Sequence, residues 1–493
     1  MTYRYLSCAV ISIALLLTGC KKLVDIDEPI DTVTSVKIFS SDEQADQTLA
    51  GMYSQIVSTD GILSMLNGGA TIYGGLAADE LGLSNGVQFA EEQEISNNKI
   101  LVNNTYSQDI LWMSTYKTIY TANAILDGEA ASTAASLTKA KRIELKASAR
   151  FFRAFSFFYL TNFFGDIPLP LSSDYRKTIR LKRASRSEVY EQIIADLKES
   201  ISLFSEPEAA VMGKTRANKV AAQALLARAY LYIQDWGNAE SYADQVIANP
   251  ACKLESLKKT FEPNSQETLL QLSINPSIDV GTTAEMKHLL PIFPLSLLPL
   301  ADQEFFLDPA NYEGFLPALT PRIIVLEKLV NAFEPIDERK STWLDYNSSP
   351  DAAPYFGKKT YYANKYPKSE SDKTNYVLIR LAELHLIRAE ARAMLNKTSL
   401  AAEDIDLIRN RAGLDKIMVA DQQSLLTAIA QERRVELFAE WGHRFFDLKR
   451  TGKALSVLSA VPGKQGITAD DLLFPIPPLE ILANSNLTQN PGY

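Results

Sequence analysis

The sequence is poor in cysteine, with three in 493 residues. Cys8 and Cys20 lie at the N-terminus, where we expect the first to be removed and the second to be modified. Cys252 is then the one free thiol of the mature chain, and an internal disulfide is excluded. Stability must therefore come from a hydrophobic core, which a chain of this length can supply.

Histidine is equally scarce, and its three occurrences match no zinc-binding motif: His288, His385 and His443. Lysine and arginine are dispersed through a chain of net charge −9, which argues against nucleic acid as a partner and against an electrostatic contact with a membrane surface. We therefore expect a lipid anchor to be the one attachment of the mature chain to a membrane. No nucleophile, general base or metal cluster of recognisable spacing occurs. We therefore expect no catalytic residues, no metal ion and no cofactor.

The N-terminus carries the features of a secretory signal. Arg4 precedes an apolar run from Leu6 to Leu17, which is about half the length that spans a bilayer. The run ends in Leu17-Thr18-Gly19-Cys20, which resembles a bacterial lipobox, and the alternative is a chance cysteine at an ordinary cleavage site. The motif predicts removal of residues 1–19, acyl chains on Cys20 and a tether over residues 20–38.

Helical periodicity dominates the rest of the chain and predicts a mainly α-helical fold. Capping boxes at Ser40–Glu43 and Ser185–Glu188 precede two of the helices, and a Phe-rich helix around Phe151–Tyr159 is expected to be buried on several sides. Helix pairs at residues 219–249 and 377–411 resemble tetratricopeptide repeats. For either pair alone, an ordinary helical hairpin is the alternative.

Two long segments lack this periodicity. Residues 58–109 are rich in glycine and asparagine, and residues 260–375 hold 12 of the 22 prolines. Segments of this length without regular structure are more often functional than accidental. We expect mostly loop in both, with short strands or helices in the second.

Aromatic side chains on such loops can stack on the apolar faces of sugars or peptides. The second segment offers six of them, with Trp343 expected to present the largest stacking face: Trp343, Tyr346, Tyr355, Phe356, Tyr361 and Tyr362. The first segment supplies candidates for an opposing wall: Tyr73, Asp79 and Asn85. The alternative is that these aromatics anchor an irregular segment onto the helices.

Charged residues of the C-terminal half recur at helical spacing. We expect them to form ion pairs between packed helices and not a binding site. The residues in question are Arg380, Glu383, Glu390, Arg434, Glu436, Arg444 and Asp447.

Several segments, taken in order, resemble the SusD/RagB family of outer-membrane nutrient-binding lipoproteins of Bacteroidetes. The segments are Phe39–Tyr53, Trp112–Leu126, Ala149–Ala154, Phe163–Pro168, the repeat that starts at Lys219, Ile379–Ala391, Glu432–Leu437, His443–Arg450, Phe474–Pro477 and Gln489–Tyr493. Taken together, in this order and after a lipobox, these segments are a specific match to that family.

The resemblance implies a bundle of tetratricopeptide-like helices with an irregular, loop-rich ligand-binding region. It further implies a lipoprotein of the cell outer membrane, facing the exterior, that binds glycans or peptides and delivers them to a SusC-like TonB-dependent barrel. We expect two regions, 39–255 and 256–493, with the irregular insertion at 260–375 in the second.

Two other classes of protein are alternatives to this interpretation. A surface hydrolase would need a carboxylate pair, and with 59 acidic residues such a pair can always be imagined. A tetratricopeptide scaffold would hold other proteins but would not need the aromatic-rich insertion.

Overall fold

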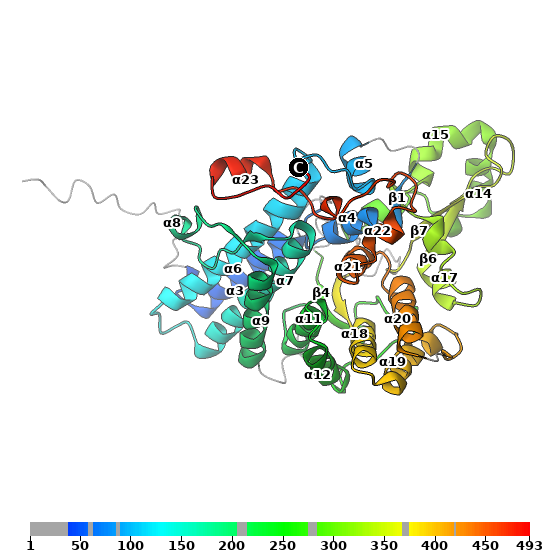
Figure 1. Ribbon diagram of the computed structural model, residues 1–493. Coiled ribbons are helices and arrows are strands. Elements are labelled where there is room, and N and C mark those ends of the chain that lie inside the picture. The colour runs from blue at the N-terminus through cyan, green and yellow to red at the C-terminus, as the bar shows by residue number, and fades with distance from the viewer. Residues whose placement is uncertain are drawn as a thin grey trace, which may run out of the picture.

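The protein is mainly α-helical, as the sequence predicts (Figure 1). The computed structural model describes residues 38–57, 63–84, 89–204, 214–274, 283–366, 374–418 and 421–493. Its helices of eight or more residues are α3 (Asp42–Val57), α4 (Gly69–Ala77), the π-helical η2 (Tyr106–Met113), α6 (Ser114–Ala131), α7 (Lys139–Phe164), α9 (Arg186–Leu203), α11 (Lys219–Tyr232), α12 (Trp236–Ile247), α14 (Leu300–Leu307), α15 (Pro309–Leu319), α18 (Leu381–Met394), α19 (Thr398–Arg411), α20 (Gln422–Glu436) and α21 (His443–Arg450).

The remaining elements are short. The helices are α5 (Ala90–Ser96), α8 (Tyr175–Thr178), α13 (Met286–Leu289), η3 (Leu295–Leu297), α16 (Glu327–Val330), α17 (Glu338–Trp343), α22 (Ala454–Leu458), η4 (Asp470–Leu472) and α23 (Pro478–Ala483). The strands form two-stranded antiparallel sheets: β1 (Leu81–Leu83) with β5 (Ile323–Val325), β2 (Ile167–Pro168) with β3 (Arg183–Ala184), β4 (Thr268–Leu272) with β8 (Tyr376–Arg380), and β6 (Leu344–Ser348) with β7 (Lys359–Ala363).

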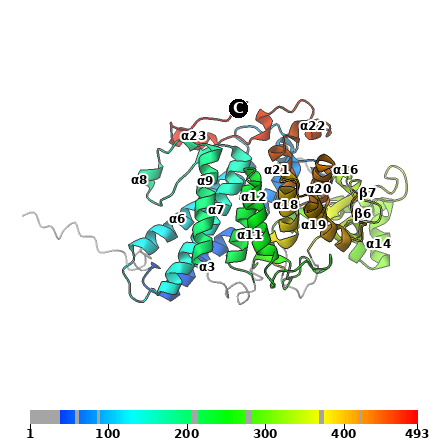
Figure 2. The same cartoon turned by 60° about the horizontal axis from the view of Figure 1, so that its bottom comes forward.

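The longer helices form one row in which each packs against the next (Figures 1 and 2). From one end to the other the order is α3, α6, α7, α9, α11, α12, α18, α19 and α20. The row continues from α12 to α18 although the chain leaves it after Ile247 and returns at Leu381. The region boundary predicted near residue 255 falls in this excursion.

Both predicted helix pairs are present, as α11 with α12 and as α18 with α19. The second pair begins later than expected, because residues 377–380 belong to strand β8 and not to the helix. The Phe-rich helix α7 is buried all round from Phe151 to Phe164. The capping box at Ser185 is also confirmed, since its hydroxyl accepts a hydrogen bond from the Glu188 backbone and the Glu188 carboxylate accepts one in return.

The expectation of mostly loop in residues 58–109 is wrong. In its described part the segment holds α4, β1, α5 and much of the π-helix, and every residue of α4 is buried. Glycine supplies the physical reason. Gly74 packs so closely on Gly442 that a Cβ on Gly74 would lie 2.7 Å from the Gly442 Cα. Glycine richness therefore marks tight helix packing here and not an open loop.

The predicted ion pairs are confirmed, although only some of them join two helices: Arg380 belongs to β8, and Asp79 lies in the turn after α4. Each of the seven charged residues forms at least one: Arg380 with Glu267, Glu436 and Glu440, Glu383 with Arg228, Glu390 with Arg450, Arg434 and Arg444 with Asp79, and Asp447 with Arg433 and Arg450. Most of these side chains are buried, so the network lies inside the fold and offers no open binding surface.

Part of residues 260–375 forms the lobe at the right of Figure 1, with α14, α15, β6 and β7, whereas β4 of the same segment lies among the helices and pairs with β8. The lobe has a small apolar core of its own, built around Leu295, Tyr312 and Leu319. Short helices and strands joined by loops are what the sequence predicts for this segment. The lobe lies at the end of the molecule opposite α3, α6 and α8 (Figures 1 and 2).

Candidate functional site

The β6–β7 hairpin carries an exposed aromatic pair. Tyr346 lies opposite Tyr361 across the two strands, with ring centroids 5.4 Å apart and planes inclined by 53°. The Tyr346 side chain is 39% exposed and Tyr361 is half-buried. Lys359, two residues before Tyr361 on the same face of the strand, places its Nζ 4.1 Å from the Tyr346 ring centroid. These three side chains form a platform of two aromatic rings and one cation.

The opposite face of the hairpin is fixed to the lobe. The Asn347 side-chain amide donates hydrogen bonds to the carbonyls of Phe293 and Leu319, at 2.8 and 2.7 Å. The Tyr362 hydroxyl donates to Asp345 at 2.9 Å. Burial, with the Asp345 carboxylate next to it, raises the pKa of Tyr362 well above its usual value. One face of the hairpin is thus anchored, while the Tyr346 face is left to solvent.

Tyr355 belongs to a different aromatic group. It lies in the turn that joins β6 to β7 and packs edge-on against Tyr312 of α15, with centroids 4.9 Å apart. Its hydroxyl donates to Glu313 at 2.7 Å. Because Tyr312 belongs to the small core that holds the Asn347 face, Tyr355 lies with that core and not on the platform. Next to it, Phe356 is 72% exposed.

The expectation that Trp343 presents a stacking face is wrong. The Trp343 side chain is 1% exposed, and its indole nitrogen donates to the Leu257 carbonyl at 3.0 Å. The ring packs edge-on against Phe261 and lies beneath Lys365, whose Nζ is 4.7 Å from the ring centroid. The expected stacking face is therefore covered on both sides. Trp343 anchors the start of β6 to the segment around Leu257 and Phe261, which is the alternative that the sequence left open.

The expectation that Tyr73 and Asp79 form an opposing wall of the site is also wrong. Tyr73 is buried in α4 and stacks on Tyr106 at 5.5 Å. Asp79 is buried and accepts hydrogen bonds from Arg434 and Arg444 at 3.1 and 2.7 Å. Burial would raise the pKa of Asp79, but these guanidinium groups outweigh it and lower that pKa. Neither side chain faces a ligand. Asn85 and Cys20 lie outside the described residues.

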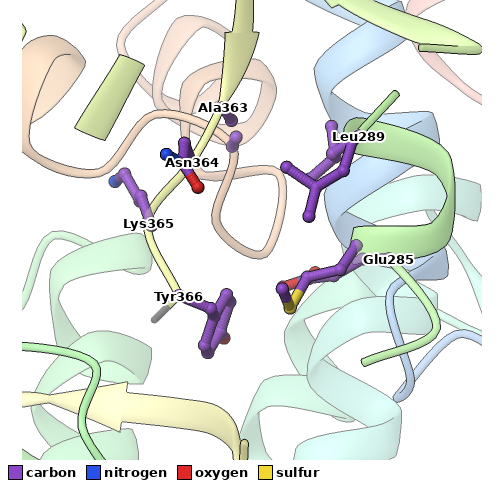
Figure 3. Close-up of a pocket in the computed structure, with 9 residues that line it drawn as sticks. Glu285, Leu289, Ala363, Asn364, Lys365 and Tyr366 are labelled. Atoms are coloured by element: carbon purple, nitrogen blue, oxygen red, sulfur yellow. The ribbon is translucent and has the colours of Figure 1, made fainter. Parts of the chain in front are cut away.

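A small cavity lies between α13 and the residues at the end of β7 and just after it, Ala363–Tyr366 (Figure 3). Its volume of about 10 Å³ holds at most about one water molecule, so it cannot take a sugar or a peptide. Burial raises the pKa of Glu285 in its wall to about 8 and lowers the pKa of Lys365 to about 8. Within the described ranges, no His, Cys, Asp and Glu side chains are grouped to hold a metal ion.

Sequence reasoning missed two features of the lobe. The first is Lys359, whose place over Tyr346 follows from strand register, which the sequence does not state. The second is a cluster of phenylalanines on and beside α14 and α15, formed by Phe293, Phe305, Phe306 and Phe315. The adjacent Phe305-Phe306 pair in a proline-bounded segment was the available signal. None of the helices described here is long and apolar enough to cross a membrane.

Two family models match successive parts of the chain. The model described as "SusD family" matches residues 334–493, and the model described as "Starch-binding associating with outer membrane" matches residues 24–231. Together they cover the helical row apart from α12. Helices α14 and α15 of the lobe lie between the two matches, whereas β6 and β7 lie within the second.

Relatives and solved structures agree with these matches. The SusD-like protein P38 of Formosa agariphila is 23% identical over 97% of this chain and 96% of its own length. The starch-binding protein SusD of Bacteroides thetaiotaomicron is 24% identical over 72% of this chain and 74% of its own. A solved "Laminarin binding SusD-like protein" superimposes with a TM-score of 0.71 at 24% identity, covering 92% of this chain and all of its own. The chain belongs to the SusD/RagB family, a family of outer-membrane-associated binding proteins that are not known to be enzymes.

Proposed function

We propose that this protein is a surface-facing outer-membrane lipoprotein that binds nutrient oligosaccharides at the Tyr346–Tyr361 platform and delivers them to a SusC-like TonB-dependent barrel. The observation that carries the proposal is the platform itself, an exposed aromatic pair on a hairpin whose other face is held by hydrogen bonds. Such a surface is already ordered before a ligand arrives, so binding costs little additional ordering.

The chemistry of the platform suits a sugar. Pyranose rings present C–H faces that pack on aromatic rings, and their hydroxyls need hydrogen-bonding neighbours. Ser348 is partly exposed on the same face of β6 as Tyr346, and Lys359 adds three N–H donors. Glycans are preferred over peptides as ligands because the named relatives bind starch and laminarin.

The alternative functions find less support. A hydrolase would need two carboxylates facing one open site. Asp79, the acidic candidate of the first irregular segment, is already paired with arginines and closed to solvent. A scaffold would have no use for an aromatic platform on a lobe outside the helical row. A binding protein uses both the row and the lobe.

The platform is tested by Tyr346→Ala, measured by titration calorimetry against laminarin and starch oligosaccharides. The expected loss is about 1–3 kcal/mol of binding free energy, by analogy with bases that stack on aromatic side chains, with thermal stability unchanged. Tyr120→Ala is the matched control, since Tyr120 is an exposed tyrosine of α6 at the opposite end.

Two outcomes would count against the site. Binding that survives both Tyr346→Ala and Tyr361→Ala would move it elsewhere on the molecule. Release of shorter sugars by the purified protein, abolished by one carboxylate substitution, would replace the binding function with a hydrolase.

Lipidation is tested by Cys20→Ala in cells. The variant is expected to leave the membrane fraction when the cells also lack the barrel, because the acyl chains are then its main attachment. Cys252→Ala is the matched control, since Cys252 is buried and should not affect fractionation. Full retention of the Cys20 variant under high salt would refute the anchor. Co-purification of a large outer-membrane barrel with the wild type tests the delivery step.

A further inference from the structure

The end of the molecule opposite the lobe carries a surface that is both basic and apolar. It is formed by residues 171–183, which include α8, and by the neighbouring helix α23 (Figures 1 and 2). We call it the α8–α23 surface. Its exposed apolar side chains are Leu171, Tyr175, Ile179, Leu479 and Leu482, and Leu482 is 83% exposed.

The two segments are held together by hydrogen bonds. The side-chain amide of Asn484 donates to the Leu181 carbonyl at 2.7 Å, and that of Asn486 donates to the Arg180 carbonyl at 2.8 Å. Arg183 donates to the Thr488 carbonyl at 2.9 Å. Leu479 and Leu482 are three residues apart on α23 and therefore project from the same side of that helix. The apolar side chains thus belong to one joined surface.

The charge of this surface opposes that of the whole protein. Residues 171–183 contain five cationic side chains and one carboxylate, in a chain of net charge −9. The carboxylate, Asp174, is paired with Arg176 at 2.9 Å. Three other cations are exposed and form no ion pair with a described residue: Lys177, Arg180 and Lys182. Clustered cations beside exposed Leu, Ile and Tyr are the pattern of a surface that rests in a lipid headgroup layer.

The position of the described N-terminus agrees with this pattern. The Phe39 carbonyl accepts a hydrogen bond from Ser132 at the end of α6. One to two turns earlier on α6, Asp127 accepts hydrogen bonds from Ser172 and Ser173 at the start of the α8 segment. Five residues of helix span about 8 Å, so the chain enters the fold close to the α8–α23 surface.

The length of chain between Cys20 and Ile38 limits how far the fold can lie from a lipid on Cys20. From Cys20 to Ile38 the chain reaches at most about 60 Å when fully extended. A lipid on Cys20 would therefore keep the α8–α23 surface within reach of the membrane. This step rests on the anchor proposed above, whereas the charge and the exposed apolar residues do not.

We propose that the α8–α23 surface binds the phosphate groups of anionic membrane lipids. Lys177, Arg180 and Lys182 pair with the headgroups, and the exposed leucines with Ile179 and Tyr175 enter the boundary with the acyl chains. A protein anchored by lipid alone would pivot on its tether. Contact through this surface fixes one orientation of the protein on the bilayer.

The test uses the chain from Lys21 onward, which lacks the lipid but retains every residue that the structure describes. It is sedimented with vesicles of phosphatidylcholine containing phosphatidylglycerol, and with vesicles of phosphatidylcholine alone. We expect binding to the anionic vesicles that weakens with salt, and little binding to the neutral ones. Each cation near an anionic surface contributes enough that Lys177→Glu, Arg180→Glu and Lys182→Glu together should weaken partition on the order of a hundredfold or more.

Lys253→Glu, Lys258→Glu and Lys259→Glu form the matched control, since they change the same charge on three exposed lysines elsewhere. The double variant Leu479→Ser with Leu482→Ser measures how much the apolar side chains contribute to vesicle binding, separately from the cations. Equal binding to both kinds of vesicle, or equal loss in the control, would overturn the proposal. So would a triple variant that still binds vesicles but no longer co-purifies with the barrel, because the surface would then face a protein. Fractionation of Cys20→Ala tests the anchor separately, so the two failures are distinguishable.

Discussion

Arg380→Met is expected to destabilise the folded protein by about 3–5 kcal/mol, measured by urea denaturation at neutral pH. The Arg380 side chain is buried at the junction of β8 and α18. Its guanidinium donates to Glu267 at 3.0 Å and to Glu440 at 2.8 Å, and it also donates to the carboxylate and carbonyl of Glu436. Removal of one partner from a buried ion pair leaves an uncompensated charge in the core, which is the source of the large cost.

The carboxylates around Arg380 determine how the stability of the folded protein depends on pH. Burial would raise the pKa of Glu436, but the guanidinium groups of Arg411, Arg380 and Arg339 hold it well below the usual value of 4.5. A carboxyl group whose pKa is lower in the folded state stabilises the fold above its unfolded pKa, and this contribution is lost as the pH falls. Wild-type stability should therefore decline below about pH 4.5. The deficit of Arg380→Met should shrink over the same range, because protonation relieves the charge left without its partner.

Arg176→Met is the matched control for this prediction. Arg176 also pairs with a carboxylate, that of Asp174, but its side chain is exposed. Solvent screens such a pair, so the urea midpoint of this variant should not move. An equal midpoint for Arg380→Met and the wild type would show that the buried network around Arg380 does not stabilise the fold.

The helical row could be predicted from the sequence because its signals are local. Capping at Ser185, the apolar stripes of α11 and the small residues of α18 each follow from the spacing of neighbouring residues. The ion pairs could be predicted for the same reason, since charges at helical spacing on buried helices need partners. Each of these inferences needs only one segment of chain.

The site could be predicted only in part, because its geometry depends on contacts between distant segments. Tyr346 and Tyr361 lie opposite each other because of the strand register. Trp343 comes from the same stretch of sequence but faces Leu257, which lies 86 residues earlier in the chain. Composition does not distinguish an aromatic ring that faces solvent from one that faces the core. Residues 69–77 illustrate the converse, since their glycines suggest a loop but serve a buried helix.

Trp343→Ala should therefore act on stability and not on ligand stacking. The substitution removes a buried indole at the start of β6, together with its hydrogen bond to Leu257 and its contact with Lys365. Large-to-small changes of this kind cost about 3–5 kcal/mol, because the surrounding core closes only partly over the space. The measurement is urea denaturation beside Tyr346→Ala, which should keep wild-type stability and lose oligosaccharide affinity.

Trp343→Phe keeps the comparison informative if the alanine variant does not fold. It preserves most of the buried area but leaves the Leu257 carbonyl without its donor, a loss of about 1–3 kcal/mol. Its oligosaccharide affinity should equal that of the wild type, because the ring at position 343 is covered by Phe261 and Lys365 and cannot touch a sugar. A phenylalanine variant of normal stability and lost affinity would show that the lobe opens in solution and exposes residue 343. The binding surface would then extend from the platform to the start of β6.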